Sequence, residues 1–311
     1  MRYEFTGETK VENGVTLHQI KRLSDNLIGG WIEKEANLSQ SGECFVYDDA
    51  CVFDNARVYD NARVSDNARV FSTAKVYGKA EVFDYAEVYG NAWIYGTTSV
   101  SGTARVSGTA RVYGNAEVYG NAIVFGAARV FVKAKVYGKA EVYGNAEIYG
   151  DASVSDNANV YGYAEVYDNA RIFGDAWIYG NAEIFDNACI YGTARVSDNA
   201  NVFGYADVYG NAWVSGDAKV YDNARVYGNA MVSNRMKIAM KMKFNEKTKY
   251  LSIDEWIYPI TIFKKYLAIG CYFLTINNWE KQYLKIAKNN NIDASSLKFC
   301  KKLIEANLKS L

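Results

Sequence analysis

One histidine is the only imidazole that the chain offers for acid–base chemistry. It is His18, alone among 311 residues. Enzymes that move protons at neutral pH use an imidazole most often, because its unperturbed pKa lies near neutrality. Zinc hydrolases commonly need two or three histidines on the metal. A single histidine therefore excludes most metallohydrolases and most histidine-based catalysts, and we expect His18 to have a structural role.

Cysteines are the second kind of reactive side chain. There are five of them, Cys44, Cys51, Cys189, Cys271 and Cys300. Their number is odd, and none has a histidine or a second cysteine at the spacing of a metal site. We expect Cys51 and Cys189 to point outward from a strand and all five to be free thiols in a reducing cytosol. The residue types thus predict no catalytic residue, no bound metal and no cofactor.

Acidic and basic residues are equal in number, 35 each, but they are unevenly placed. Residues 235–311 contain 15 basic and 6 acidic side chains, so an acidic body carries a basic C-terminal segment. The hydrophobic content of 50% is ample for a buried core. The chain has no apolar signal core and no apolar run that approaches a membrane span. We expect a cytoplasmic protein.

An unbroken six-residue repeat occupies the middle of the chain. From Val46 to Val232 every sixth residue is Val or Ile, 32 times without an insertion. Four residues after each stands a small side chain, and Thr98 is the single departure from alanine in 31 positions. The pair before the alanine reads Gly-Asn, Asp-Asn or a close variant. Such a regular pattern indicates a repeat architecture.

The repeat specifies a strand and a turn in every six residues. In Arg57-Val58-Tyr59 the middle residue points inward and its neighbours point outward. Gly and Asn accept the positive φ of tight turns, and alanine fits the inner corner. Strands this short bury their apolar side only by stacking on the next turns of the chain. The repeat therefore predicts a parallel β-solenoid with a core of Val and Ile.

The unit Val-Tyr-Gly-Asn-Ala-x, as in residues 118–123 and 142–147, resembles the hexapeptide repeat of left-handed β-helix proteins. The resemblance implies a mainly β fold, a left-handed parallel β-helix with three repeats, about 18 residues, per coil. The 32 repeats then make ten to eleven coils. The N-terminal segments resemble those of phage and prophage hexapeptide-repeat proteins and of a related bacterial group assigned as acyltransferases. The matching segments are Glu4–Lys10, Thr16–His18, Gly29–Ile32 and Asn37–Ser39.

Segments without the repeat flank the solenoid. The predicted domains are an N-terminal β cap over residues 1–43, the β-helix over 44–234 and a basic, small α+β domain over 235–311. Beyond Val232 the predicted strands are Met236–Phe244, Lys249–Ile253 and Tyr266–Ile269. Thr275 and Asp293 are predicted to cap two helices.

An acetyl-CoA-dependent acyltransferase is the enzymatic alternative that the resemblance implies. In that class a histidine is the general base, and loops inserted between coils help to build the acyl-donor site of a trimer. Residues 44–234 contain no histidine, and the unbroken register admits no inserted loop. Carbonic anhydrases of the β-helix type hold zinc with three histidines. We therefore expect no enzymatic activity.

Outward side chains are then the place to look for function. The residue after each aliphatic position is Tyr or Phe in most repeats and Ser in seven. With three repeats per coil, one of the three faces receives no serine and is predicted to carry a continuous aromatic ladder. Its ten rings are Tyr59, Tyr77, Tyr95, Tyr113, Phe131, Tyr149, Tyr167, Phe185, Phe203 and Tyr221.

The other outward column of this face separates its charges. In order it reads Arg57, Lys75, Trp93, Arg111, Arg129, Glu147, Glu165, Glu183, Asn201 and Lys219. We predict that the basic half and its rings form an interaction face, since Tyr, Trp and Arg dominate the energetics of protein interfaces. Rings that only stabilise the sheet are the alternative, and a basic half beside an acidic half is also compatible with a two-fold dimer.

The basic C-terminal segment is a second candidate surface. Its residues Arg235, Lys237, Lys241 and Lys243 suit contacts to phosphates, so nucleic-acid binding is a further alternative. Lysines on an exposed strand also commonly block edge pairing. The leading prediction is a non-catalytic interaction protein of phage or prophage type. Its rigid β-helix would dock on a protein partner, either a host factor such as a defence component or a virion component, and homo-oligomers (dimer or trimer) are compatible with it.

Overall fold

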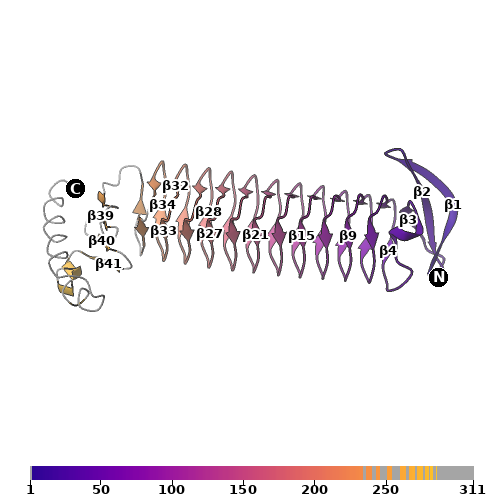
Figure 1. The fold of residues 1–311 in the computed structure, drawn as a ribbon, viewed down its shortest axis with the longest axis horizontal. Coiled ribbons are helices and arrows are strands. Elements are labelled where there is room, and N and C mark those ends of the chain that lie inside the picture. The colour runs from indigo at the N-terminus through magenta and orange to yellow at the C-terminus, as the bar shows by residue number, and fades with distance from the viewer. Residues whose placement is uncertain are drawn as a thin grey trace.

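A computed structural model describes residues 2–233, 236–239, 243–245, 251–253, 260–263, 266–269, 272–275, 277–279, 281–282 and 285. The described part consists of short strands and turns, with almost no helix. Short strands repeat along one axis and form a straight stack of coils behind an N-terminal cap (Figure 1). The architecture is mainly β.

Each coil contributes one two-residue strand to each of three parallel sheets, here called A, B and C. Every strand pairs in register with its counterpart three repeats later, as Val58 does with Val76. No register shift interrupts the coils from β4 to β37 among the described pairs. The predicted parallel β-solenoid with 18 residues per coil and about 11 coils is confirmed.

The strands of sheet B carry the predicted interaction face. They are β6 (Arg57–Val58), β9 (Lys75–Val76), β12 (Trp93–Ile94), β15 (Arg111–Val112), β18 (Arg129–Val130), β21 (Glu147–Ile148), β24 (Glu165–Val166), β27 (Glu183–Ile184), β30 (Asn201–Val202), β33 (Lys219–Val220) and β36 (Lys237–Ile238).

Sheets A and C form the other two sides. Within the coils sheet A contains β5 (Cys51–Val52), β8 (Arg69–Val70), β11 (Glu87–Val88), β14 (Arg105–Val106), β17 (Ile123–Val124), β20 (Glu141–Val142), β23 (Asn159–Val160), β26 (Trp177–Ile178), β29 (Arg195–Val196), β32 (Trp213–Val214) and β35 (Met231–Val232). Sheet C contains β4 (Phe45–Val46), β7 (Arg63–Val64), β10 (Glu81–Val82), β13 (Ser99–Val100), β16 (Glu117–Val118), β19 (Lys135–Val136), β22 (Ser153–Val154), β25 (Arg171–Ile172), β28 (Cys189–Ile190), β31 (Asp207–Val208), β34 (Arg225–Val226) and β37 (Lys243–Phe244).

The inward Val, Ile and Ala side chains fill one continuous core along the stack. They are fully buried in almost every coil. Each aliphatic side chain contributes about 1.5 to 3 kcal/mol when it leaves water, so three per coil make the core the main source of stability. Thr98, which replaces an alanine, is also buried, and its hydroxyl donates to the Tyr95 carbonyl oxygen at 2.8 Å.

Positive φ values mark the first turn residue of the repeats. Glycine occupies most of these positions, and aspartate most of the others. The aspartate carboxylate accepts a hydrogen bond from the backbone N–H of the next coil. Asp84 binds the N–H of Gly102 at 2.9 Å, and Asp60 binds that of Gly78 at 3.2 Å. This charged hydrogen bond offsets the cost of a left-handed conformation for a residue with a Cβ atom.

Val132 is the β-branched exception at this turn position. Its φ is +64°, a conformation that such a residue rarely adopts, and its side chain is 47% exposed. We expect Val132→Gly to raise the free energy of unfolding by about 1 kcal/mol, since it relieves left-handed strain and removes no buried contact. Urea denaturation followed by circular dichroism measures the change. Glycine at the next residue, Lys133→Gly, should instead lower stability, and an equal loss in both variants would contradict the assignment of strain.

The N-terminal cap covers the first coil. It contains β1 (Tyr3–Glu12), β2 (Val15–Arg22) and β3 (Ile28–Ile32), which pair antiparallel in that order, and β3 then pairs in parallel with β5. A Cβ atom on Gly29 or Gly30 would lie 2.6 Å from the nearest atoms of the first coil. Only glycine therefore permits this close approach. The short 3-10 helix η1 (Glu35–Asn37) leads into the coils.

Parallel pairing continues beyond Val232. Strands β36 and β37 stack on β33 and β34, and they belong to two different sheets. The prediction of a single strand over 236–244 is therefore wrong. Ile238 and Phe244 keep the six-residue spacing, and the preceding coil offers each of them an in-register backbone partner. The alternation of apolar and basic residues conceals that spacing in the sequence.

Further strands follow near the C-terminus. They are β38 (Leu251–Ile253), β39 (Ile260–Phe263), β40 (Tyr266–Ile269) and β41 (Tyr272–Thr275), joined in antiparallel order. Residues 277–279, 281–282 and 285 are helical, and the Asn278 N–H donates to the Thr275 hydroxyl at 3.2 Å. The predicted helix at Asp293 lies outside the described residues, and the α+β domain as a whole stays a prediction.

Candidate interaction face

The outward side chains of sheet B form two parallel columns, which we call the B face. One column is the aromatic ladder, and the other is the charged column that begins at Arg57. A two-residue strand fixes both, because the inward aliphatic residue separates two outward neighbours. Each column gains one member per coil, so its members lie one above the other.

The predicted aromatic ladder is confirmed. Nine consecutive ring pairs link Tyr59 to Tyr221, with centroids 4.8 to 5.1 Å apart and planes within 13° of parallel. Rings this close and parallel are offset-stacked, an arrangement that aromatic pairs favour. Serines interrupt the equivalent columns of the other sheets, for example Ser107 in sheet A and Ser155 in sheet C. The B face is thus the one side with an unbroken ladder.

Several phenols of the ladder are partly buried, and this burial raises their pKa. It raises the pKa of Tyr113 above its usual value. Burial, followed by the negative charges of Glu183 and Glu165, raises the pKa of Tyr167 to about 12. The Tyr149 hydroxyl donates a hydrogen bond to the Glu165 carboxylate at 3.0 Å. The phenols with a raised pKa are therefore neutral hydroxyl donors at neutral pH.

The first half of the charged column is basic around a tryptophan. The Lys75 ammonium lies 4.7 Å and the Arg111 guanidinium 4.9 Å from the Trp93 ring centroid, on strands that flank the indole. Arg57 is exposed and makes no ion pair with any described residue. These cations keep their charge uncompensated by carboxylates, and the cation–π contacts hold two of them in place.

The second half of the column is acidic. Glu147, Glu165 and Glu183 are direct neighbours on adjacent strands. At the junction of the two halves Arg129 and Glu147 form an ion pair of 3.0 Å. The column then ends through Asn201 in Lys219. The B face thus carries a positive and a negative segment end to end.

Sheets A and C arrange their charges differently, because many of their charged side chains form ion pairs within the sheet. Across adjacent coils the pairs are Arg69–Glu87 and Arg105–Glu87 in sheet A, at 3.2 and 3.4 Å, and Arg63–Glu81, Lys135–Glu117 and Arg225–Asp207 in sheet C, at 3.9, 3.1 and 3.3 Å. The sequence shows only that the signs mix on these two sides. Segregated charge is therefore specific to the B face among the described strands.

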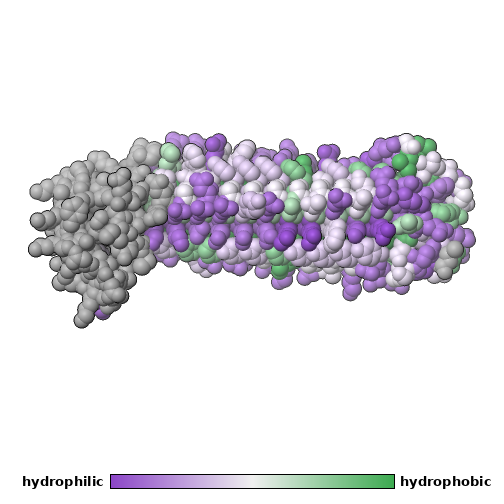
Figure 2. All heavy atoms as spheres, in the orientation of Figure 1, coloured by the Kyte–Doolittle hydropathy of each residue, from purple (hydrophilic) through white to green (hydrophobic). Residues whose placement is uncertain are grey.

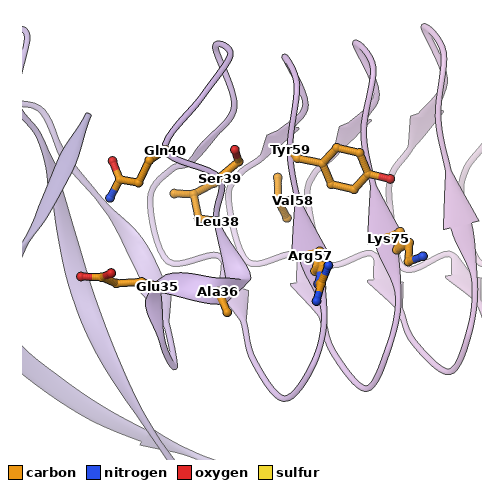
Figure 3. Close-up of a pocket in the computed structure, with 9 residues that line it drawn as sticks. All are labelled: Glu35, Ala36, Leu38, Ser39, Gln40, Arg57, Val58, Tyr59 and Lys75. Atoms are coloured by element: carbon orange, nitrogen blue, oxygen red, sulfur yellow. The ribbon is translucent and has the colours of Figure 1, made fainter. Parts of the chain in front are cut away.

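An open pocket of about 590 Å³ lies where the cap meets the basic end of the B face. Figure 3 shows the residues that line it, with Arg57 and Lys75 side by side and Glu35 on the side of the cap. The Tyr59 ring, the first of the ladder, extends away from Gln40 and over the neighbouring coil (Figure 3). The pocket makes the basic end of the B face concave, a feature that the six-residue pattern does not predict because the cap forms one wall.

The side of the coils that faces the viewer in Figure 2 is organised in columns. Figure 2 shows hydrophilic side chains in bands that run along the stack of coils. Such bands follow from the constant length of the coil, since one type of side chain recurs at one corner or face.

The reactive side chains named from the sequence do not come together. His18 lies in β2 beside the Phe5 ring, with centroids 5.2 Å apart. Burial raises the pKa of the Cys44 and Cys51 thiols, which opposes formation of the nucleophilic thiolate. Cys51, expected on the outer surface, is buried against Leu17 and Phe53 because the cap covers this coil. Cys189 points outward as expected and is half-buried.

The search for two other kinds of site concerns only the described ranges. There, no three His, Cys, Asp or Glu side chains are grouped as metal ligands. In the same ranges no helix is long and apolar enough to cross a membrane.

The second candidate surface is divided between two faces. Lys237 lies in β36 of sheet B and Lys243 in β37 of sheet C. Arg235 and Lys241 lie outside the described residues. The basic side chains of this segment thus do not share one strand, and the single basic strand on which the nucleic-acid alternative was based is absent from the described part of the chain.

Comparison with known protein families agrees with the fold. The family model described as the YdcK beta solenoid repeat matches residues 56–72, 164–180 and 218–234. A search of curated proteins finds no match to the chain. Each matching segment spans about one coil, and together with the stacked coils they show that the chain is a β-helix repeat protein.

Proposed function

We propose that the chain is a non-catalytic interaction protein whose rigid solenoid docks on a protein partner through the B face. One observation carries the proposal: the unbroken aromatic ladder runs beside a column whose charges are segregated and largely unpaired. Tyr, Trp and Arg are the residues that most often dominate interface energies. A stack held by backbone pairing in every coil also presents them with little loss of conformational freedom on binding.

The resemblance of the repeats and of the N-terminal segments supports two further parts of the proposal. The helix is left-handed, and the protein is of phage or prophage type. For such a protein the candidate partners are a host factor, such as a defence component, a virion component or a second copy of the chain. The cytoplasm of the host is then the place where the two meet.

Serine substitutions in the basic half test the docking function. The triple variant Tyr95→Ser, Tyr113→Ser and Phe131→Ser removes three adjacent rings and leaves the inward core intact. We expect it to lose its specific partner in affinity purification from host cells with quantitative mass spectrometry, by about tenfold or more relative to the wild-type chain. The oligomeric state is measured on the same samples.

The matched control removes three stacked rings from sheet A, with Tyr143→Ser, Tyr161→Ser and Tyr179→Ser. It should retain the partner, because it disturbs an equivalent stack on another side. Unchanged partner recovery and unchanged oligomeric state in the B-face variant would exclude this face. Equal losses in both variants would show that the ladders serve stability alone.

A further inference from the structure

The two halves of the B face complement each other, and we propose that its protein partner is a second copy of this chain, bound antiparallel. The two copies are related by a two-fold axis in the plane of the interface and perpendicular to the solenoid axis. This inference rests on the proposed function, since it names the partner of the same face. It adds the orientation and the register of the contact.

The first argument is the run of like charges in each half. Glu165 lies between Glu147 and Glu183 on adjacent strands, and strands stack about 4.8 Å apart. Like charges directly opposite each other destabilise a sheet. In the basic half Arg57 lies beside Lys75 on the adjacent strand, so like charges are again direct neighbours. Sheets A and C avoid it by pairing opposite charges across coils. The repulsion on the B face is relieved if a second copy brings the opposite sign.

The second argument is the position at which the sign changes. It changes between Arg129 and Glu147, on β18 and β21. The ten-ring ladder has its midpoint at the same place, between Phe131 and Tyr149, with five rings on each side. A two-fold axis at this point therefore places ladder on ladder over all ten coils. The same operation places Arg129 and Arg111 of each copy opposite Glu147 and Glu165 of the other, and Lys75 opposite Asn201.

The register of the contact follows from this axis. Going outward from the centre, Arg129 faces Glu147 of the second copy, Arg111 faces its Glu165, and Trp93 faces its Glu183. Each contact occurs twice, because a two-fold interface is isologous. At the far ends Arg57 faces Lys219 of the second copy, at the solvated rim where ions screen the repulsion. A parallel pair, with its two-fold axis along the solenoid, would instead place the charged column of each copy opposite the aromatic ladder of the other, so only the antiparallel arrangement brings opposite charges together.

The geometry of the sheet permits contact along the whole face. Strands β6 to β36 pair without a register shift, and the coils stack in a straight line in Figure 1. Ten coils at about 4.8 Å each make a strip roughly 48 Å long. One side of a coil is narrow, which puts the interface at the small end of specific contacts. We therefore expect a dimer with a micromolar dissociation constant that weakens as the salt concentration rises.

A charge swap between Arg111 and Glu165 tests the register. In one chain the two residues are three coils or about 14 Å apart, with Arg129 and Glu147 between them, so they cannot compensate each other directly. Sedimentation equilibrium should show that Arg111→Glu or Glu165→Arg alone raises the dimer dissociation constant about 100-fold. The double variant Arg111→Glu/Glu165→Arg should return to within about tenfold of the wild-type value, because each new glutamate meets a new arginine across the interface.

Two controls make the result specific. The double variant Arg111→Glu/Glu183→Arg has the same net charge as the swap. Its new glutamate still faces Glu165 of the second copy and its new arginine faces Trp93, so it should stay dissociated. Arg195→Glu changes an exposed arginine of sheet A and should leave dimerisation unchanged. Circular dichroism confirms that each variant is folded.

The outcomes separate this inference from the proposed function. A wild-type chain that stays monomeric over the whole dilution series, or a swap without rescue, overturns the antiparallel dimer. If the serine variant of the ladder still loses a host or virion protein in that case, the docking function holds with a different partner. Rescue by the swap, with none in the wrong-coil variant, supports the dimer and its register together.

Discussion

Ile148→Asp is expected to lower the free energy of unfolding by about 5 kcal/mol, the largest effect of any single change considered for the coils. Ile148 is fully buried in β21, and its strand pairs with those of Val130 and Val166. The change removes a buried aliphatic side chain and puts a carboxyl group where no hydrogen-bond partner exists in the apolar core. Urea denaturation measures the loss.

The shape of the transition should change as well. In a solenoid each coil contacts only its neighbours, so stability is close to a sum of coil and interface terms. A defect in the middle uncouples the two halves, so we expect one unfolding step for the wild-type chain and two for the variant. Burial raises the pKa of the introduced carboxyl above its unfolded value, so the variant should regain part of its stability as the pH falls and the group becomes neutral.

Ile123→Asp is the matched control, because it makes the same chemical change on an outward position. Ile123 lies in β17 of sheet A between Arg105 and Glu141. Surface changes of this kind usually alter stability by less than about 0.5 kcal/mol. Comparable losses in the two variants would contradict the inward and outward assignment of the repeat.

Gly96→Ala is expected to have the next largest effect, a loss of about 3 kcal/mol. Gly96 has a φ of +83°, and a Cβ atom there would lie 2.6 Å from the Gly114 carbonyl oxygen and 2.9 Å from its nitrogen. Both neighbours are backbone atoms that are fixed by the stacking of the next coil. The substitution thus adds a steric clash to the cost of a left-handed conformation. Thermal or urea unfolding measures the loss.

Gly90 supplies the comparison within the same kind of turn. Its φ is +66°, and a Cβ atom would lie 3.0 Å from the nearest backbone atom of Gly108. Gly90→Ala should therefore cost only about 1 kcal/mol. Gly90→Asp should recover most of that loss, because aspartates at this position accept the N–H of the next coil, as Asp84 does from Gly102 at 2.9 Å. If the Gly90→Ala and Gly90→Asp variants are equally stable, this hydrogen bond contributes nothing to the free energy of unfolding.

The sequence predicts the coils well because the repeat acts locally and identically each time. An aliphatic residue every six positions, an alanine at the corner and a turn pair leave one way to bury the apolar side, and the observed sheets follow it. The coil of three repeats, taken from a resemblance, then stacks Tyr95 on Tyr113 without further information. The aromatic ladder and the order of the charged column could be predicted for the same reason.

Contacts outside the repeat could not be predicted in this way. Cys51 occupies an outward position of its strand, yet the cap buries it against Leu17, a residue that the six-residue spacing does not relate to it. The sequence pattern after Val232 predicts one strand where the structure has two, because alternating apolar and basic residues hide the six-residue spacing of Ile238 and Phe244. In both cases the deciding contact joins segments that have different sequence patterns.

The features of the candidate site also fall into two groups, those that the repeat predicts and those that depend on other contacts. The sequence by itself determined the solenoid, its core and the columns of the B face. Each coil repeats the previous one along the solenoid axis, so residues that recur once per coil in the sequence become neighbours in space. Only the tertiary structure decided which charges form ion pairs, how Lys75 and Arg111 flank the Trp93 ring, and how the cap forms one wall of the open pocket at Arg57. Side-chain directions and the approach of the cap depend on the shape of neighbouring residues in three dimensions, which a repeat period does not contain.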